Sequence, residues 1–194
     1  KHGKDLYAGY KLDGDNRIWT YLPYGPFDSL ADFLSWLEDK SKSQDPLFFA
    51  IIDQKSGQAQ GITSFLRIVE GHGVIEVGHI NYSPMLQKTP TATEAMYLMM
   101  RYVFEELGYR RYEWKCDALN EGSRNAATRL GFTFEGIFRQ ALIYKGRNRD
   151  TAWFSITDSE WPKLKVAFEH WLDGANFTEK GEQRQSLSQL QNRL

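Results

Sequence analysis

Residues 87–94 read Gln87-Lys88-Thr89-Pro90-Thr91-Ala92-Thr93-Glu94, and they join a β-rich run to the most regular helical pattern of the sequence. From Ala92 to Leu107 apolar residues recur at helical spacing, and Gly108 supplies the stop signal. Thr91 and Glu94 have the spacing of a capping box, which predicts a helix start at Thr91. The positive end of this helix is a candidate phosphate site, although a capping box by itself requires no ligand.

Upstream of this segment, three apolar runs predict strands over residues 47–52, 61–69 and 74–82. The last two are separated only by residues 70–73, so a hairpin is the natural connection. Before them, apolar residues at helical spacing predict an amphipathic helix within residues 27–42, which Asp28 or Ser29 can cap.

Downstream, the pattern predicts a strand over residues 111–117 and a short helix over 121–130 that ends at Gly131. The strand places Tyr112, Trp114 and Cys116 on one face. Two further strands, 132–144 and 151–157, are expected to pair across a charged turn at residues 145–150, and a last helix is expected from Trp161 to Trp171 after a cap at Asp158 or Ser159.

The order of these elements predicts an α+β fold with a mixed, mostly antiparallel sheet flanked by helices. No repeat or linker divides the chain, so we predict a single domain over residues 1–178. From Gly181 the chain becomes rich in Gln and Ser, and residues 179–194 are predicted to form a polar tail.

Composition excludes several classes of protein. The 24 basic and 25 acidic residues nearly cancel, which gives no electrostatic reason to expect a nucleic-acid or membrane partner. A single cysteine allows no intrachain disulfide and no Cys-based metal cluster. No apolar run approaches the roughly 20 residues that span a bilayer. We therefore expect a metal-free cytoplasmic protein.

A second strand-to-helix turn carries Asn120 and Ser123, and the helix after it ends in Leu130-Gly131-Phe132. Asn120 taken alone is most simply an N-cap. Taken in order, however, Gln87 and Ala92, the long helix, Asn120-x-x-Ser123 and Leu-Gly-Phe resemble the acetyl-CoA-binding half of the GNAT acetyltransferases, over roughly residues 47–157. The continuation Ala92-Thr93-Glu94-Ala95 is similar to the Rim-type branch of that family.

The resemblance implies a GNAT-like sheet with splayed central strands and acetyl-CoA as co-substrate. It implies that the strand ending at Ile80, Asn81 and Tyr82 bonds the pantetheine arm through its backbone. It implies that the loop clasps the pyrophosphate through Gln87, Lys88, Thr89, Thr91, Ala92 and Thr93. One departure is Pro90, which stands where the family has glycine and has no N–H to offer a phosphate.

For catalysis, the resemblance implies that Asn120 steadies the pantetheine amide or a water and that Ser123 protonates the departing thiolate. The general base is left open among Glu76, His79, Glu113 and Asp117, since strand alternation places these candidates on different faces. Glu76 is preferred, because a carboxylate near a buried thioester site can have a raised pKa. The alternative is that Glu76 is a solvated or ion-paired strand residue.

The function implied is an N-acetyltransferase that moves an acetyl group to a primary amine by direct attack in a ternary complex. The acceptor is a protein N-terminus or a small amine, and the protein is a monomer or homodimer. Two alternatives remain: a catalytically silent acyl-CoA sensor, motivated by Pro90, and a nucleotide-binding domain of another family. Cys116 is interpreted as a buried structural thiol, and the basic turn at 145–149 as a solvated hairpin turn.

Overall fold

Six strands form one sheet in the computed structural model of the chain, which describes residues 1–193. The strands are β1 (Leu47–Ile52), β2 (Ala59–Val69), β3 (Val74–Tyr82), β4 (Arg111–Asp117), β5 (Thr133–Tyr144) and β6 (Arg147–Thr157). Their order in the sheet is β1-β2-β3-β4-β6-β5, with β3 and β4 parallel and every other pair antiparallel. The predicted mixed, mostly antiparallel sheet is therefore confirmed.

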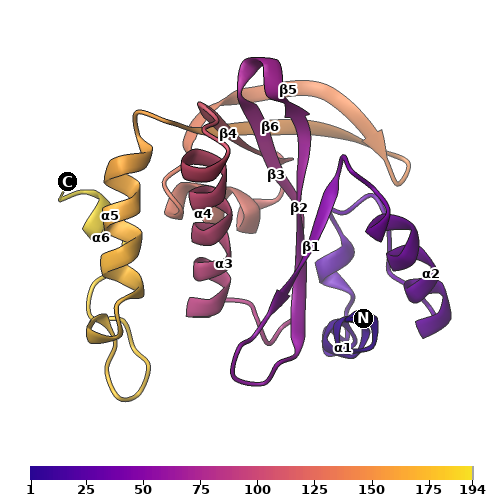
Figure 1. The fold of residues 1–194 in the computed structure, drawn as a ribbon. Helices are drawn as coiled ribbons and strands as arrows, with labels where there is room; N and C mark the ends of the chain where they lie inside the picture. Colours follow the sequence, from indigo (N-terminus) through magenta and orange to yellow (C-terminus); the bar gives the residue numbers. More distant parts are fainter. Residues whose placement is uncertain (194) are drawn as a thin grey trace.

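Helices cover both faces of this sheet (Figure 1). They are α1 (Gly3–Tyr10), α2 (Leu30–Ser41), α3 (Pro90–Arg101), α4 (Glu121–Arg129), α5 (Trp161–Leu172) and α6 (Leu187–Gln191), with 3-10 turns at Arg17–Trp19, Glu70–His72 and Gly174–Asn176. A π-helical turn at Tyr102–Glu106 extends α3 toward Gly108, the predicted stop, which has φ 64°. Figure 1 shows α1 and α2 on one side of the sheet and α3 to α6 on the other.

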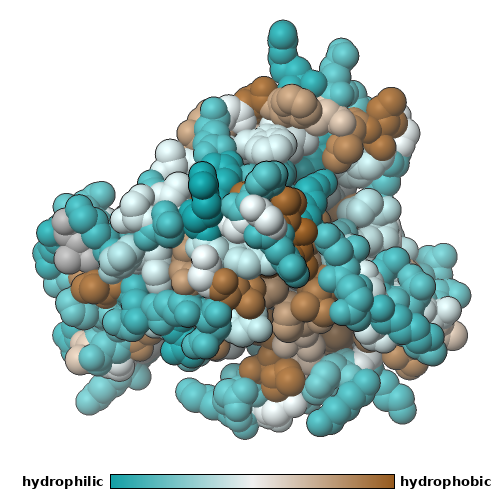
Figure 2. All heavy atoms as spheres, turned by 45° about the horizontal axis from the view of Figure 1, so that its top comes forward, coloured by the Kyte–Doolittle hydropathy of each residue, from teal (hydrophilic) through white to brown (hydrophobic). Residues whose placement is uncertain are grey.

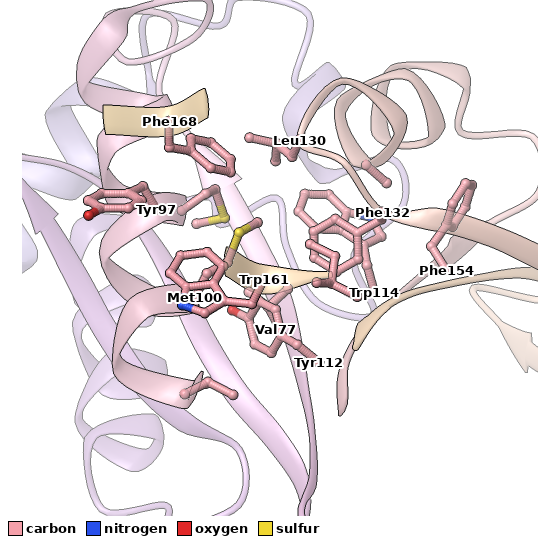
Figure 3. Packing of buried hydrophobic residues seen from close by; sticks show 14 of the residues in the cluster. Val77, Tyr97, Met100, Tyr112, Trp114, Leu130, Phe132, Phe154, Trp161 and Phe168 are labelled. Atoms are coloured by element: carbon pink, nitrogen blue, oxygen red, sulfur yellow. The ribbon is translucent and has the colours of Figure 1, made fainter. Parts of the chain in front are cut away.

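The larger core lies between the sheet and α3, α4 and α5 (Figure 3). Val77, Tyr112 and Trp114 face it from the strands, and Met100 and Phe168 face it from the helices. A fully buried side chain of this size stabilises the fold by about 1.5–3 kcal/mol through removal of apolar surface from water. The smaller core packs α1 and α2 against β2 and contains Trp19 and Phe33.

The start of α3 differs from the prediction. Thr89, not Thr91, is the N-cap: its Oγ1 accepts the N–H of Ala92 at 3.2 Å. Pro90 is the first helical residue, a position where its fixed φ suits the helix and its missing N–H leaves no intrahelical bond unmade. The capping box predicted from Thr91 and Glu94 is wrong, because Pro90 already begins the helix.

Two other boundaries are corrected. The β5–β6 turn consists only of Lys145 and Gly146, both with positive φ as in a type I′ hairpin, so residues 147–150 belong to β6 and not to the predicted turn. Helix α5 has Glu160 as its N-cap residue, without the side-chain cap predicted from Asp158 or Ser159. In α2 the cap is Ser29, one of the two predicted candidates.

The end of the chain is more ordered than a polar tail. Residues 187–191 form α6, which begins with a capping box at Ser186 and Gln189. Its Leu187 and Leu190 are buried in the larger core. The helix was not predicted, because in this Gln- and Ser-rich segment only these two apolar residues indicate a buried helix face. At one edge of the sheet, β5 exposes apolar side chains such as Phe138 and Ile143. Figure 2 shows several hydrophobic patches on the surface among mostly hydrophilic residues.

Candidate active site

The parallel strands β3 and β4 pair only from Val74 with Arg111 to Val77 with Trp114. Beyond these residues each strand continues without the other, as predicted for splayed central strands. Two cavities open there. One, of about 670 Å³, lies at the start of α3 and is called the α3 cavity. The other, of about 930 Å³, lies between the loop after α1 and the β5–β6 hairpin and is called the hairpin cavity.

The two cavities meet at the point where the strands separate. The residues that line both are Ile18, Ile80, Gln87, Lys88, Trp114, Asn120, Gly122 and Ser123. Ligands in the two cavities can therefore approach each other at the ends of β3 and β4.

Most of the predicted cofactor residues line the α3 cavity. They are Ile80, Asn81, Tyr82, Gln87, Lys88, Thr89, Ala92, Thr93, Asn120 and Ser123, and Thr91 is absent from this lining. The Gln87 side chain donates its Nε2–H to the carbonyl of Tyr82 at 3.0 Å and so ties the loop to the end of β3. Because Thr89 occupies the Ala92 amide and Pro90 has none, the helix start offers fewer amides to an anion than we predicted.

Charge in the α3 cavity is of one sign. Lys88 and Arg129 line it, and the described lining contains no Asp or Glu. The first turn of α3, whose positive end faces the cavity, likewise contains no acidic residue. The cavity is therefore suited to an anionic ligand such as a diphosphate.

Asn120 and Ser123 are held by each other and by β4. The side-chain oxygen of Asn120 accepts the N–H of Ser123 at 3.1 Å, so Asn120 is the N-cap of α4. The indole Nε1–H of Trp114 donates to Oγ of Ser123 at 2.9 Å. Trp114 was predicted only as a strand residue, and its alternation with Tyr112 gave no indication of this role.

A β-bulge brings Glu76 and His79 to the same cavity. The β2–β3 register shifts between Ile62 and Ser64, and His79 has φ 50°. Simple alternation would place residues 76 and 79 on opposite faces, but both line the hairpin cavity. The expectation that the base candidates lie on different faces is therefore wrong for this pair.

Glu76 is an ion-paired residue buried to 3% exposure. Its Oε2 lies 2.6 Å from Nη1 of Arg67 and 2.9 Å from Nζ of Lys115. The same Lys115 Nζ lies 2.6 Å from Oε2 of Glu113, which stands opposite Glu76 in the β3–β4 register. Among residues 1–193, Oε1 of Glu76 has no hydrogen-bond donor, so this oxygen is available to a ligand of the hairpin cavity.

His79 is kept neutral by its surroundings. Burial, followed by the charges of Arg67 and Lys40, lowers its pKa from 6.5 to about 4. Its ring stacks on Tyr24 at 5.6 Å between centroids, and its Nδ1 lies 3.2 Å from the Tyr24 hydroxyl. An imidazole with so low a pKa is a weak base at neutral pH.

The hairpin end of this cavity is built by Asp117 and its neighbours. The Tyr144 hydroxyl donates to Oδ2 of Asp117 at 2.7 Å, and Arg147 Nη2 lies 3.4 Å from the same oxygen. Lys145 and Gly146 are exposed, as expected for a solvated hairpin turn, and Lys145 Nζ also donates to the carbonyl of Trp19 at 2.8 Å, which joins the turn to the loop after α1. Burial raises the pKa of the Cys116 thiol, in agreement with an unreactive structural thiol.

The part of the chain that the structure describes contains no group of three or more His, Cys, Asp or Glu side chains that could hold a metal ion. In the same residues no helix combines the length and the apolar character of a membrane span.

Comparisons with known proteins agree with this architecture. The profile of the family described as "Acetyltransferase (GNAT) domain" matches residues 2–133. The crystal structure of a GCN5-related N-acetyltransferase from Brucella melitensis is 49% identical, with a TM-score of 0.96 over 98% of this chain and 86% of that one.

Two curated relatives come from Bacillus subtilis. The uncharacterized N-acetyltransferase YnaD is 25% identical over 158 residues, which is 81% of this chain and 91% of YnaD. The putative ribosomal N-acetyltransferase YdaF is 35% identical over 69 residues, which is 36% of this chain and 38% of YdaF.

Proposed function

Because the chain belongs to the GNAT acetyltransferase family and uses acetyl-CoA as co-substrate, we propose that it acetylates a primary amine held in the hairpin cavity. Acetyl-CoA is assigned to the α3 cavity. The observation that carries the proposal is the shared lining of the two cavities, because it lets an amine on one side reach an acyl group on the other.

The α3 cavity fits the chemistry of this co-substrate. Its cations and the positive end of α3 match a diphosphate, and the end of β3 at Ile80, Asn81 and Tyr82, which extends beyond the pairing with β4, offers backbone groups to the pantetheine amides. When bound, acetyl-CoA supplies the activated acyl group. The chain's own residues orient it, exclude water and handle the protons.

Ser123 assists the departure of sulfur. Its Oγ accepts the Trp114 N–H, so its hydroxyl hydrogen is the group that Ser123 can offer at the cavity junction. There it donates a hydrogen bond to the sulfur as the C–S bond breaks. Asn120, whose side-chain oxygen caps α4, keeps Ser123 at this position and retains an amide N–H₂ for the pantetheine arm or a water.

Glu76 receives the amine. Its free Oε1 accepts a hydrogen bond from the nitrogen and takes its proton as the nitrogen bonds to the acyl carbon. Arg67 and Lys115 hold the carboxylate in place through Oε2. Donors aimed at the developing oxyanion commonly contribute about 2.7–4 kcal/mol each, so positioning at this junction is as important as proton transfer.

The acceptor is a protein N-terminus or a small amine. The local similarity to the putative ribosomal N-acetyltransferase YdaF supports a Rim-type protein acceptor. The hairpin cavity contains the carboxylates of Asp13, Asp15, Glu76 and Asp117 together with cationic side chains, and this mixture is compatible with an ammonium group of either kind.

Thiol release measured with short peptides and small amines tests the proposal, in parallel with thermal shift by acetyl-CoA. We expect acetyl-CoA to raise the melting temperature and at least one amine to release CoA in step with its own acetylation. Stabilisation by acetyl-CoA without turnover of any amine would instead identify a silent sensor. Stabilisation by ATP or NAD but not by acetyl-CoA would contradict the cavity assignment.

A further inference from the structure

Arg129, the last residue of α4, lies at the first turn of α3 although 36 residues separate it from Thr93. Its Nη1 donates to Oγ1 of Thr93 at 3.1 Å, and its guanidinium lies 5.0 Å from the centroid of the Trp171 ring. The residue is half-buried, and this burial lowers its pKa. Arg129 therefore presents a partly desolvated cation to the α3 cavity.

No carboxylate neutralises this cation within residues 1–193. Arg129 forms none of the ion pairs of that region, and the other charged residue of the described cavity lining is Lys88. Removing a charge from water without an opposite charge nearby costs free energy. A bound anion offsets this cost. The neighbouring helix start adds partial positive charge of its own.

We propose that Arg129 binds the diphosphate of coenzyme A and takes over the role of the amide that is missing at Pro90. The inference rests on the assignment of acetyl-CoA to the α3 cavity. A guanidinium is a strong substitute for one amide, because its fork of donors can bond two phosphate oxygens at once. Thr93 positions the fork at the helix start, where the diphosphate has to lie.

The C-terminal segment holds Arg129 in this orientation. Trp171 stacks under the guanidinium and donates its Nε1–H to Oε1 of Gln183 at 2.8 Å. Gln191 of α6 donates its Nε2–H to the carbonyl of Arg129 at 3.2 Å. Trp171, Phe177, Gly181 and Gln183 also line the cavity themselves. These C-terminal partners of Arg129, from Trp171 to Gln191, lie beyond residues 2–133, the region that the family profile matches.

Calorimetric titration of coenzyme A into the wild type, Arg129→Met and Arg129→Lys tests the inference without any turnover. Methionine keeps the apolar stem over Trp171 and removes the charge. We expect Arg129→Met to bind about 10- to 100-fold more weakly, the loss of one or two charged hydrogen bonds, and Arg129→Lys to restore part of the affinity. Arg124→Met is the matched control, because Arg124 lies on the same helix but outside the α3 cavity.

Two shorter ligands locate the contact. Dephospho-CoA retains the diphosphate, so Arg129→Met should weaken its binding as much as that of coenzyme A. Pantetheine lacks all phosphates, so its binding should be unchanged. A loss confined to coenzyme A would move Arg129 to the 3′-phosphate and overturn the inference, as would unchanged binding of all three ligands. If the wild type itself bound no coenzyme A, the proposed function would fail instead.

Discussion

The indole Nε1 of Trp114 lies 2.9 Å from Oγ of Ser123, and this contact connects the core face of β4 to the junction of the two cavities. Trp114 is 5% exposed, so its N–H has little access to water as an alternative partner. The serine oxygen is thereby committed as an acceptor, and its hydrogen is the part that it can donate. The roles of the junction residues can be separated by substitution.

Ser123→Ala removes the free hydroxyl hydrogen that we assign to the departing sulfur. We expect kcat to fall about 10-fold or more with little change in KM for acetyl-CoA, because the contact strengthens only as the C–S bond breaks.

Asn120→Ala should lower kcat and also destabilise α4 by about 1 kcal/mol through loss of its N-cap, whereas Asn120→Asp keeps the cap. Steady-state kinetics and chemical unfolding measure both effects. Equal changes in kcat and KM would argue against these roles.

Glu76→Gln and Glu113→Gln form a matched pair. Both glutamates bind Lys115, but only Glu76 lines the hairpin cavity. We expect a comparable loss of stability from the two substitutions, and a fall in kcat of about 100-fold or more for Glu76→Gln alone. Initial rates with a saturating amine give the comparison. Similar kinetics for the two variants would remove Glu76 from the mechanism.

Charge reversal of Lys88 tests the loop before α3. Lys88→Glu places an anion beside the assigned diphosphate, so KM for acetyl-CoA should rise while kcat changes little. The effect should shrink at high salt, because Lys88 is exposed and its field is screened. Lys55→Glu, in an exposed turn outside both cavities, is the control for net charge. An unchanged KM would mean that Lys88 does not face the anion.

His79 predicts a specific dependence of stability on pH. The pKa of His79 is about 4 in the folded protein and 6.5 ordinarily. Between pH 4 and pH 6.5 the unfolded chain therefore binds more protons at this residue than the folded protein does. The stabilisation from neutral His79 is fully present above pH 6.5 and is lost as pH falls toward 4, by about 3 kcal/mol in total. Urea unfolding at several pH values should therefore show a shallower decline for His79→Gln, while exposed His72→Gln keeps the wild-type slope.

Much of the fold follows from local sequence pattern. The long apolar stripe before Gly108 and the alternation in β4 each determine one element, and β1, β3 and β4 have the predicted bounds. Helix boundaries were less secure. Thr89 and Thr91 are both good caps, and the fixed φ of Pro90 decides between them in favour of Thr89.

The site was less predictable, because its key contacts join distant parts of the chain. Arg129 reaches Thr93 and Trp171 only in the folded molecule, and nothing in residues 121–130 marks it as a cavity residue. The bulge that gives His79 its positive φ is signalled only by Gly78 within the strand, yet it reverses the face on which His79 lies. Strand alternation therefore failed at the point where the strand departs from regular geometry.

The bond from Lys145 to the carbonyl of Trp19 fastens the two-residue β5–β6 turn to the loop after α1, and this turn lies outside the α3 cavity. On the proposed assignment, hairpin residues such as Tyr144, which line the hairpin cavity but not the α3 cavity, contribute to acceptor preference apart from the coenzyme contacts. Exchange of residues 144–147 for those of a relative should give an enzyme that is retargeted to another amine and still draws on the same acyl donor.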